Sequence, residues 1–455
     1  MNRLSVGFVS LGCPKNLVDT ENMISALSNK GFSITGNESE ADVIVVNTCG
    51  FLEPAKQESM STIGEFLERK KSGDLKALVV AGCMTERYLK PMQEAFPEVD
   101  AFVRTGQFSQ IVPIVEELSE KEKISSRWRL TGEASAQLQG HSEIHDFVKR
   151  LESKRPYAYV KISEGCNRTC SFCIIPKLRG KHHSRSIEGI VDEIQQLVSA
   201  GTKEIILIAQ DLTSYGRDLK NGTSLLKLLK AVEEISDLKW YRLLYNYPRF
   251  FDDELIQFLA SSQRFSGYLD IPFQHSSDAV LKMMKRPETG EQIRDLISKL
   301  RENLPELSLR TTLMVGFPGE SDSDFQNLLE FVEASEFDHM GAFTYFREKD
   351  TPSYDLDNQV PDEIKQARLD ELMHLQSIIQ QKKLSKKVGK TLDVMIDALA
   401  EKTKSGLLYR ARHAGQAPEI DGLTYVLSKA PLTIGEIYPA RINKVLGHYD
   451  LSAEL

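Results

Sequence analysis

The chain has 455 residues, of which 41% are hydrophobic and 27% are charged, and its formal net charge is −8. A chain of this length is too long to fold around one ordinary hydrophobic core, so we predict two or three domains. The negative net charge excludes a global electrostatic field that attracts nucleic acid or anionic membranes, and it favours a basic partner. No apolar run reaches the roughly 20 residues that span a bilayer, and no secretory signal opens the chain, so we expect a cytoplasmic protein.

The first 118 residues alternate between strand-like and helix-like patterns and form the first predicted domain. Short runs of Val, Ile and Leu are typical of buried parallel strands, and the segments between them have helical spacing. This order predicts a doubly wound parallel sheet of the α/β class. The expected strands are residues 6–11, 43–47 and 78–81, and the expected helices are residues 18–29 and 54–70.

Three of the six cysteines follow the predicted strands of this domain. Cys13, Cys49 and Cys83 each stand where an apolar run ends. Ligands of open α/β sheets bind beyond the carboxyl ends of the strands, so the three thiols are predicted to converge on one site. The alternative is that they are three ordinary buried thiols, since free cysteine is often a small core residue.

Residues 119–151 are polar and show no sustained period, which indicates a linker. Residues 152–382 then resume the alternation of strands and helices. Six strands with five helices between them predict a partial (β/α)6 version of the eight-fold barrel, whose active site lies at the carboxyl ends of the strands. The expected strands are 157–162, 204–209, 240–245, 268–272, 309–315 and 341–345, and the expected helices are 187–200, 224–236, 252–261, 289–303 and 322–333.

A long helix is predicted from Pro361 to about residue 387, with acidic residues in its first turn and lysines in its last. Five short strand-like runs follow within the last predicted domain, residues 383–455. They predict a small five-stranded β-barrel of the kind that binds nucleic acid or protein. The runs are residues 392–398, 407–412, 423–427, 437–445 and 449–452.

The other three cysteines form the motif CxxxCxxC directly after the first strand of the central domain. Cys166, Cys170 and Cys173 are close enough in sequence to bind one four-iron cluster and to leave its fourth iron open. An open iron can chelate the amino and carboxylate groups of S-adenosylmethionine (SAM), and one electron then cleaves a C–S bond to give an adenosyl radical. The competing interpretation is structural zinc, with His182 or His183 as the fourth ligand.

Several residues around this motif are candidates for binding SAM. Phe172 could shield the cluster and pack on adenine, although ordinary loop packing explains it equally well. Gln210 and Asp211 end the second strand and could hold the amino end or ribose of SAM, against the alternative of exposed loop polars. Gly316 and Gly319, in the sequence GFPGE, could let the backbone approach SAM or could simply form a tight turn. Two arginines that flank the cluster loop could offset its charge or bind a carboxylate, although ordinary surface arginines explain them equally well: Arg179 and Arg185.

These motifs resemble those of a known family. The sequence CNRTCSFC resembles the radical-SAM superfamily, and SLGCPKN, NTCGF and AGC around the dispersed cysteines resemble the amino-terminal domain of the methylthiotransferases. The terminal barrel resembles a TRAM domain. The stretches IPFQHSS at 271–277 and APEIDG at 417–422 resemble the RimO branch, which modifies an aspartate of small-subunit ribosomal protein twelve, although Phe273 stands where that branch commonly has leucine.

The resemblance implies two 4Fe-4S clusters, one on each cysteine triplet. The cluster on Cys166, Cys170 and Cys173 would cleave SAM, and the radical would take a hydrogen from the aspartate β-carbon. The other cluster would carry the sulfur that joins this carbon, and a further SAM would supply the methyl group. The implied partners are a reductant protein and the basic ribosomal protein, free or on the ribosome, and the barrel could contact RNA.

Two alternatives are weighed against this function. The first is methylthiolation of a transfer-RNA adenosine. It is disfavoured by the net charge and by the terminal barrel, in which residues 393–455 hold seven Lys and Arg against eight Asp and Glu. The second is a non-catalytic Fe–S or zinc protein that binds RNA, which the two open three-cysteine sites disfavour.

Overall fold

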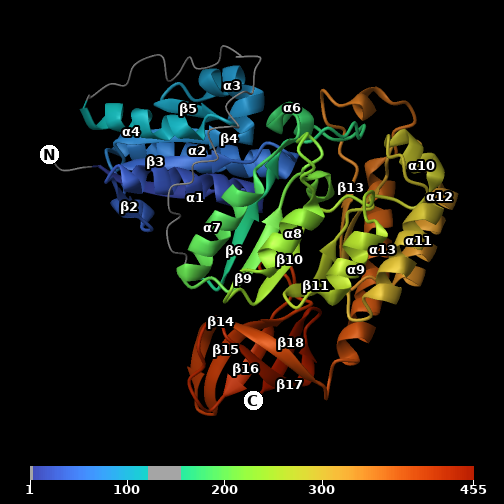
Figure 1. Cartoon of the computed structure of the whole chain (residues 1–455). Coiled ribbons are helices and arrows are strands. Elements are labelled where there is room, and N and C mark those ends of the chain that lie inside the picture. Colours follow the sequence, from blue (N-terminus) through green and yellow to red (C-terminus); the bar gives the residue numbers. More distant parts are fainter. Residues whose placement is uncertain (1–3, 121–154) are drawn as a thin grey trace. The chain divides into compact units, whose positions relative to one another are not determined.

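The computed structural model describes residues 4–120 and 155–455, which form two compact units (Figure 1). The first unit contains residues 4–120 and the segments Ser163–Asn167 and Ile174–Glu193. The second unit contains the remaining described residues, including Arg168–Cys173 and Ile194–Leu455. The predicted linker, 119–151, lies outside the described residues except for its first two, which end helix α4 (Ile111–Glu120). None of the described helices is both long and apolar enough to span a membrane.

The first unit is built on a five-stranded parallel sheet with the order β2-β1-β3-β4-β5, which confirms the predicted doubly wound class. Two short edge strands, β2 and β5, join the three predicted from the apolar runs. The strands are β1 (Ser5–Ser10), β2 (Ser33–Thr35), β3 (Val43–Thr48), β4 (Ala77–Gly82) and β5 (Ala101–Arg104). The helices between them are α1 (Pro14–Asn29), α2 (Glu53–Ser72) and α3 (Cys83–Ala95), with α4 after β5.

Both faces of this sheet are buried, which explains why its central strands are continuous apolar runs. Side chains of a strand alternate between the two faces. Val43 and Val45 therefore pack in one core with residues of α1 and α4. Ile44 and Val46 pack in a second core with residues of α2 and α3. With helices on both faces, the sheet presents its carboxyl edge to the loops that carry Cys13, Cys49 and Cys83.

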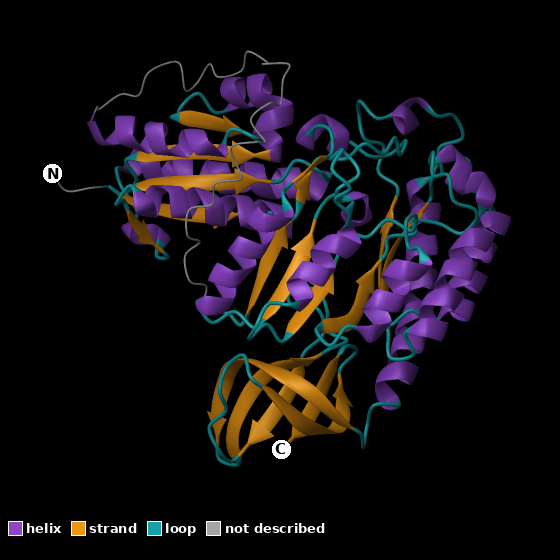
Figure 2. Cartoon of the chain, in the orientation of Figure 1, coloured by secondary structure: helices purple, strands orange, loops and turns teal. Residues whose placement is uncertain are grey.

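The second unit contains a six-stranded parallel sheet in which β6, β9, β10, β11, β12 and β13 are neighbours in chain order. Its strands are the orange arrows between purple helices in Figure 2. All six predicted strands and all five predicted helices are present. The strands are β6 (Tyr157–Lys161), β9 (Glu204–Ile208), β10 (Trp240–Leu243), β11 (Phe265–Asp270), β12 (Ser308–Val315) and β13 (His339–Thr344). The helices are α7 (Ile187–Ser199), α8 (Leu225–Glu233), α9 (Asp253–Ser261), α11 (Gly290–Asn303) and α12 (Asp322–Ser335), and a short α10 (Asp278–Met283) precedes α11.

Helix α13 (Asp362–Ser385) packs on α12 and β13 and leads to a closed five-stranded barrel. The barrel order is β14-β15-β16-β18-β17, in which β16 and β18 are parallel and the other pairs are antiparallel. This confirms the predicted small barrel. Its strands are β14 (Thr391–Thr403), β15 (Gly406–His413), β16 (Thr424–Ser428), β17 (Ile437–Leu446) and β18 (Asp450–Glu454).

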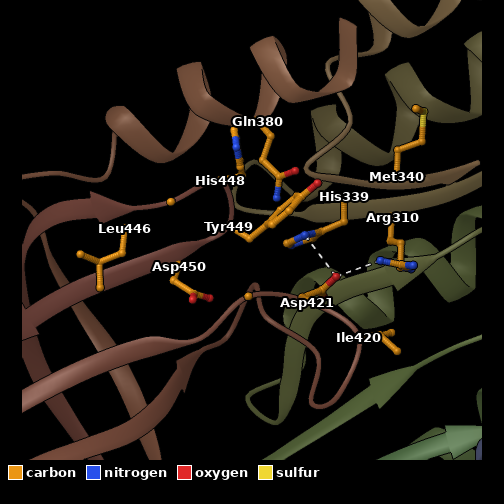
Figure 3. A pocket seen from close by; sticks show the side chains of 12 residues that line it. Arg310, His339, Met340, Gln380, Ile420, Asp421, Leu446, His448, Tyr449 and Asp450 are labelled. Atoms are coloured by element: carbon orange, nitrogen blue, oxygen red, sulfur yellow. Dashed lines mark hydrogen bonds and ion pairs between the residues drawn. The ribbon is translucent and has the colours of Figure 1, made fainter. Parts of the chain in front are cut away.

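Buried charges join the barrel to the sheet of the second unit. The carboxylate of Glu204 on β9 pairs with Arg242 at 2.8 Å and with Arg412 of the barrel at 2.7 Å, and all three side chains are fully buried. A second cluster lies beside a cavity of about 530 Å³, where Asp421 contacts Arg310 and faces His339 (Figure 3). The barrel is therefore held to the sheet by specific ion pairs as well as by packing.

Candidate active site

The dispersed cysteines all lie at the carboxyl edge of the first sheet, as the sequence predicts. Cys13 follows β1 and caps the amino end of α1, where it is exposed. Cys49 follows β3 and is half-buried, and Cys83 begins α3 and is buried. Two of the three cysteines, Cys13 and Cys83, thus stand at the amino ends of helices.

Backbone packing brings the three cysteine loops together. A Cβ built on Gly12, next to Cys13, would lie 3.0 Å from the sulfur of Cys49. A Cβ on Gly50, next to Cys49, would lie 3.2 Å from the carbonyl carbon of Cys83. The close approach of each loop to the next one therefore depends on a glycine.

Asn16 is the polar centre of this edge. Its Nδ2 donates to the carbonyl oxygens of Leu11 at 2.9 Å and Thr48 at 3.0 Å, so one side chain fixes the loops after β1 and β3. Its Oδ1 lies 3.7 Å from the sulfur of Cys83, which can donate to it. Asn16 is the last residue of the SLGCPKN motif, but the sequence did not predict the role of this side chain.

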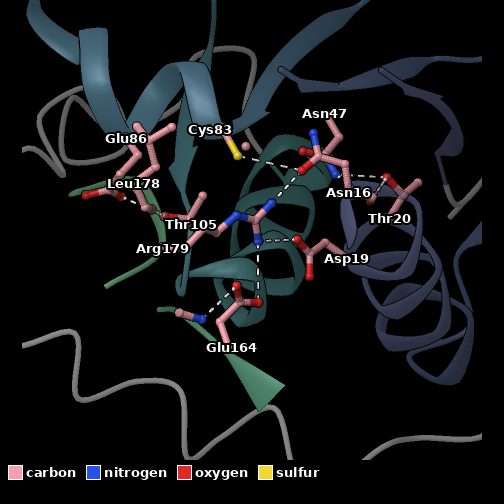
Figure 4. Close-up of polar contacts among 12 residues, drawn as sticks. Asn16, Asp19, Thr20, Asn47, Cys83, Glu86, Thr105, Glu164, Leu178 and Arg179 are labelled. Carbon is pink, nitrogen blue, oxygen red and sulfur yellow. Dashed lines mark hydrogen bonds and ion pairs between the residues drawn. The ribbon is translucent and has the colours of Figure 1, made fainter. Parts of the chain in front are cut away.

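Arg179 supplies the positive charge of the same site (Figure 4). It lies at the end of α6 (Ile175–Arg179), a helix of the first unit that was not predicted. Burial raises the pKa of Cys49, and it raises the pKa of Cys83 to about 11, while the charge of Arg179 opposes both shifts. A buried thiol becomes a metal-binding thiolate more readily when such a cation stands beside it.

The residues of this edge fit an iron–sulfur cluster. Three thiols converge there, and Asn47 holds a buried Oδ1 that accepts no hydrogen bond from the described residues. Within residues 4–120 and 155–455, no group of three or more His, Cys, Asp and Glu side chains is arranged to hold one metal ion. A cluster needs no such group, because its thiolates bind different irons and stand further apart than the ligands of a single ion.

The compact motif is anchored by its backbone. The N–H of Cys166 donates to the carbonyl of Gly180 at 3.1 Å, in the first unit. In the second unit, the N–H of Cys173 donates to the carbonyl of Cys170 at 3.2 Å. Ser171 between them donates from its N–H to the carbonyl of Met284 at 2.9 Å, which ties the loop to the end of α10. The motif is thus held by fixed contacts in both units.

Phe172 and the GFPGE turn meet in one apolar cluster. The ring of Phe172 packs edge-on against Phe317, with 6.5 Å between ring centroids. Gly316 has a φ of 72°, and the N–H groups of Gly316 and Phe317 both donate to the carboxylate of Glu320. Gly319 has a φ of 85° and lies beside Met283. The structure therefore shows a tight turn at the end of β12 that faces the cluster loop.

Asp211 binds the cluster loop directly. Its carboxylate accepts from Arg168 at 2.7 Å and caps the short 3-10 helix that begins at Leu212. Arg168 also lies over the ring of Tyr247, with its guanidinium carbon 3.7 Å from the ring centroid. Gln210 precedes Asp211 at the end of β9. Arg168, inside the CNRTCSFC motif, was not singled out from the sequence, although a cation within a cluster-binding loop could have marked it.

The basic residues after the motif have separate surroundings within the first unit. Arg185 pairs with Glu193 at 2.6 Å in a buried salt bridge. The Nε2 of His182 lies 3.1 Å from the hydroxyl of Ser184. Of the two arginines that follow the compact motif, Arg179 has its partners Asn16 and Asp19 beside the dispersed cysteines.

Comparisons with known proteins identify the three parts of the chain. Residues 5–104 match the Uncharacterized protein family UPF0004, residues 160–332 match the Radical SAM superfamily, and residues 388–455 match the TRAM domain. The radical SAM methyltransferase TsrM from Kitasatospora setae has a similar fold, with a TM-score of 0.58 at 14% identity over 78% of this chain and 77% of that chain. The fold and the cysteine motif thus define a radical SAM enzyme with a terminal TRAM domain.

Proteins that are similar along the full length of the chain show which family within this class it belongs to. The chain is 43% identical over 452 residues to the ribosomal protein uS12 methylthiotransferase RimO of Clostridioides difficile, covering 99% of each chain. It is 44% identical to RimO of Geotalea uraniireducens, covering 99% of this chain and 98% of that protein. The chain belongs to the RimO family of radical-SAM methylthiotransferases.

Proposed function

We propose that this enzyme methylthiolates the β-carbon of an aspartate in ribosomal protein uS12, using two 4Fe-4S clusters and two SAM-dependent steps. The observation that carries the proposal is the combination of full-length likeness to RimO proteins with both cysteine triplets in place. In the reaction, a C–H bond at the β-carbon is replaced by a C–S bond, and the sulfur carries a methyl group.

Each triplet would hold one cluster. When bound, the clusters supply the reductive cleavage of SAM at Cys166, Cys170 and Cys173 and the delivery of sulfur at the dispersed triplet. The loops after β1, β3 and β4 position the dispersed thiols, and the Asn16 side chain fixes two of these loops.

The loops at the carboxyl ends of the second sheet would bind SAM. Phe172 would cover the adenine, because its ring already belongs to the apolar cluster beside the GFPGE turn. Gly316 and Gly319 would belong to this binding turn, where the space that a Cβ would occupy is filled by the side chains of Lys365 and Met283. Gln210 and Asp211 would bind the ribose or amino end, and the contact of Asp211 with Arg168 keeps this strand end next to the cluster loop.

Charge and location favour a basic protein substrate. A net charge of −8 attracts a basic ribosomal protein, free or on the ribosome. The terminal barrel would contact this protein or neighbouring RNA, and a reductant protein would supply the electrons. We expect the enzyme to work in the cytoplasm, where ribosomes are assembled.

The decisive test is the mass of uS12. Anaerobically reconstituted enzyme, SAM, a sulfide source and a chemical reductant should add one methylthio group to a uS12 aspartate, seen by tandem mass spectrometry of its peptides. A transfer-RNA substrate treated in parallel should stay unmodified. Unmodified uS12 beside methylthiolated RNA would contradict the proposal.

Iron counting tests the two cluster sites separately. The reconstituted chain should hold about eight irons. A Cys166→Ala, Cys170→Ala, Cys173→Ala triple variant should hold about half of them and make no 5′-deoxyadenosine. Cys49→Ala should still cleave SAM but add no sulfur, and a loss of cleavage in this variant would argue against separate roles.

A further inference from the structure

Arg179 is buried in the first unit and fixed by three side chains. Its guanidinium donates to Asp19 at 2.7 Å, to the Oδ1 of Asn16 and to Glu164 at 3.5 Å, and its side chain is 3% exposed (Figure 4). Two carboxylates and an amide therefore hold one cation in a single orientation. An arginine suits this role because its planar fork keeps its charge and forms several hydrogen bonds at once.

The helix that carries Arg179 is an integral part of the cysteine site. Leu178 packs in one apolar cluster with Cys83, and its carbonyl accepts from the hydroxyl of Thr105 at 2.7 Å. The charge of Arg179 acts on the Cys83 thiol and opposes the burial-induced rise of its pKa. The Oδ1 of Asn16 contacts both the guanidinium and this thiol. The packing of Leu178 and the shared contact with Asn16 thus place this cation near the Cys83 sulfur.

The charges around this site require compensation. With a cluster bound, three thiolates would add their negative charge to that of the carboxylates of Asp19 and Glu164, and uncompensated buried charge is costly. Arg179 pairs with both carboxylates and shares the Oδ1 of Asn16 with the Cys83 sulfur. Its position thus suits an anionic occupant that becomes more negative on reduction, because a fixed nearby cation stabilises the more negative state.

We propose that Arg179 is a positioning and charge-compensating residue for the cluster on Cys13, Cys49 and Cys83 and raises the reduction potential of that cluster. This inference rests on the proposed function, which places a cluster there. Asp19 acts in the opposite sense, since it is a fixed negative charge that partly neutralises Arg179. The geometry also predicts that charge matters more than shape, so lysine should replace Arg179 better than glutamine does.

The test uses the full-length Cys166→Ala, Cys170→Ala, Cys173→Ala variant as the parent, because it isolates the cluster of interest. Redox titration followed by electron paramagnetic resonance then gives one potential. In this background, Arg179→Gln should move the potential to more negative values and Asp19→Asn to more positive values, whereas Arg179→Lys should stay near the parent. Arg185→Gln is the matched control, since Arg185 is a buried arginine of the same segment that pairs with Glu193.

The outcomes separate the two proposals. A parent without iron would overturn the proposed cluster site and the role of Arg179 with it. A parent with a normal cluster whose potential is unchanged by Arg179→Gln and by Asp19→Asn would overturn only the role of Arg179. If Arg179→Gln fails to retain iron, the sign of the Asp19→Asn shift decides: a positive shift supports the role, and no shift or a negative one refutes it.

Discussion

Glu204 is a fully buried carboxylate that pairs with two fully buried arginines in the joint between the sheet and the barrel. The Glu204→Gln substitution keeps the size of the side chain and removes its charge. Arg242 and Arg412 then share a buried region in which Asp397, paired with Arg412 at 2.7 Å, is the remaining carboxylate of the network. We expect this substitution to destabilise the second unit strongly.

The magnitude follows from the burial. Breaking a buried ion pair by removing one partner costs about 3–5 kcal/mol, or roughly 100-fold to 4000-fold in the folding equilibrium. The second unit has about 280 residues. With an unfolding entropy of about 2.1 cal/mol/K per residue, this loss corresponds to a fall of roughly 5–8 °C in its unfolding temperature.

The assay is calorimetry at pH 7 on the single variants and on the double variant Glu204→Gln, Arg412→Met. The double variant removes one positive charge together with the negative one, so it should lose about 1–3 kcal/mol less than the sum of the singles. Glu254→Gln, which breaks an exposed pair with Lys230, is the control and should change stability by less than about 0.5 kcal/mol. Additive losses would refute the idea that the network acts as a unit.

Because Glu204 pairs with the arginines only when it is charged, the stability of the joint between sheet and barrel should depend on pH. Burial opposes the charge of Glu204, but Arg412 and Arg242 outweigh it and lower its pKa below the ordinary value of 4.5. A lowered carboxyl pKa contributes stability that is present above pH 4.5 and is lost as the pH falls through the folded value. The stability difference between the natural chain and Glu204→Gln should therefore shrink below pH 4.5, and a constant difference down to pH 3 would count against the assignment.

Two further predictions concern the first sheet and a buried histidine. Gly82 has a φ of 100°, and a Cβ there would lie 2.3 Å from the Oδ1 of Asn47 and 2.5 Å from the carbonyl oxygen of Thr48. Gly82→Ala should therefore lower the free energy of unfolding, measured in urea, by about 2–4 kcal/mol. Gly64→Ala, in an open position of helix α2, should be neutral or slightly stabilising, and equal effects would contradict the steric argument. Burial lowers the pKa of His275 to about 4. Protonation of this histidine in the unfolded chain should therefore remove about 2 kcal/mol of stability between pH 7 and pH 5. His275→Gln should reduce this loss.

The fold could be predicted where burial leaves a clear periodicity. The central strands of both sheets are covered on both faces and read as apolar runs, so their positions follow from the sequence. The elements that were missed are short or interrupted. Strands β2 and β5 have three and four residues, and helix α3 contains Pro91. Helix α6 has five residues and depends on tertiary contacts such as that of Leu178 with Thr105.

The candidate site could be predicted only in part, for a related reason. The cysteines of the first sheet stand at strand ends, and strand ends can be read from local sequence. Two of the three partners of Arg179, Asn16 and Asp19, are 163 and 160 residues away along the chain. No local pattern encodes such a contact. Sequence adjacency suggested a role for Arg179 beside the compact triplet, whereas its contact with Asn16 leads us to propose a role at the dispersed one.

The loop 417–422, which resembles the RimO branch, has its acidic side chains engaged within the second unit. Its Asp421 is buried, and its carboxylate accepts from Tyr268 at 2.7 Å, Arg310 at 2.9 Å and the N–H of Ala417 at 2.9 Å. Its Glu419 accepts from Tyr159 at 3.2 Å. The acidic groups of the loop are therefore used inside the second unit, where they fix the barrel to the sheet. Any influence of this loop on substrate choice would act through the position of the barrel, because its carboxylates already serve that joint.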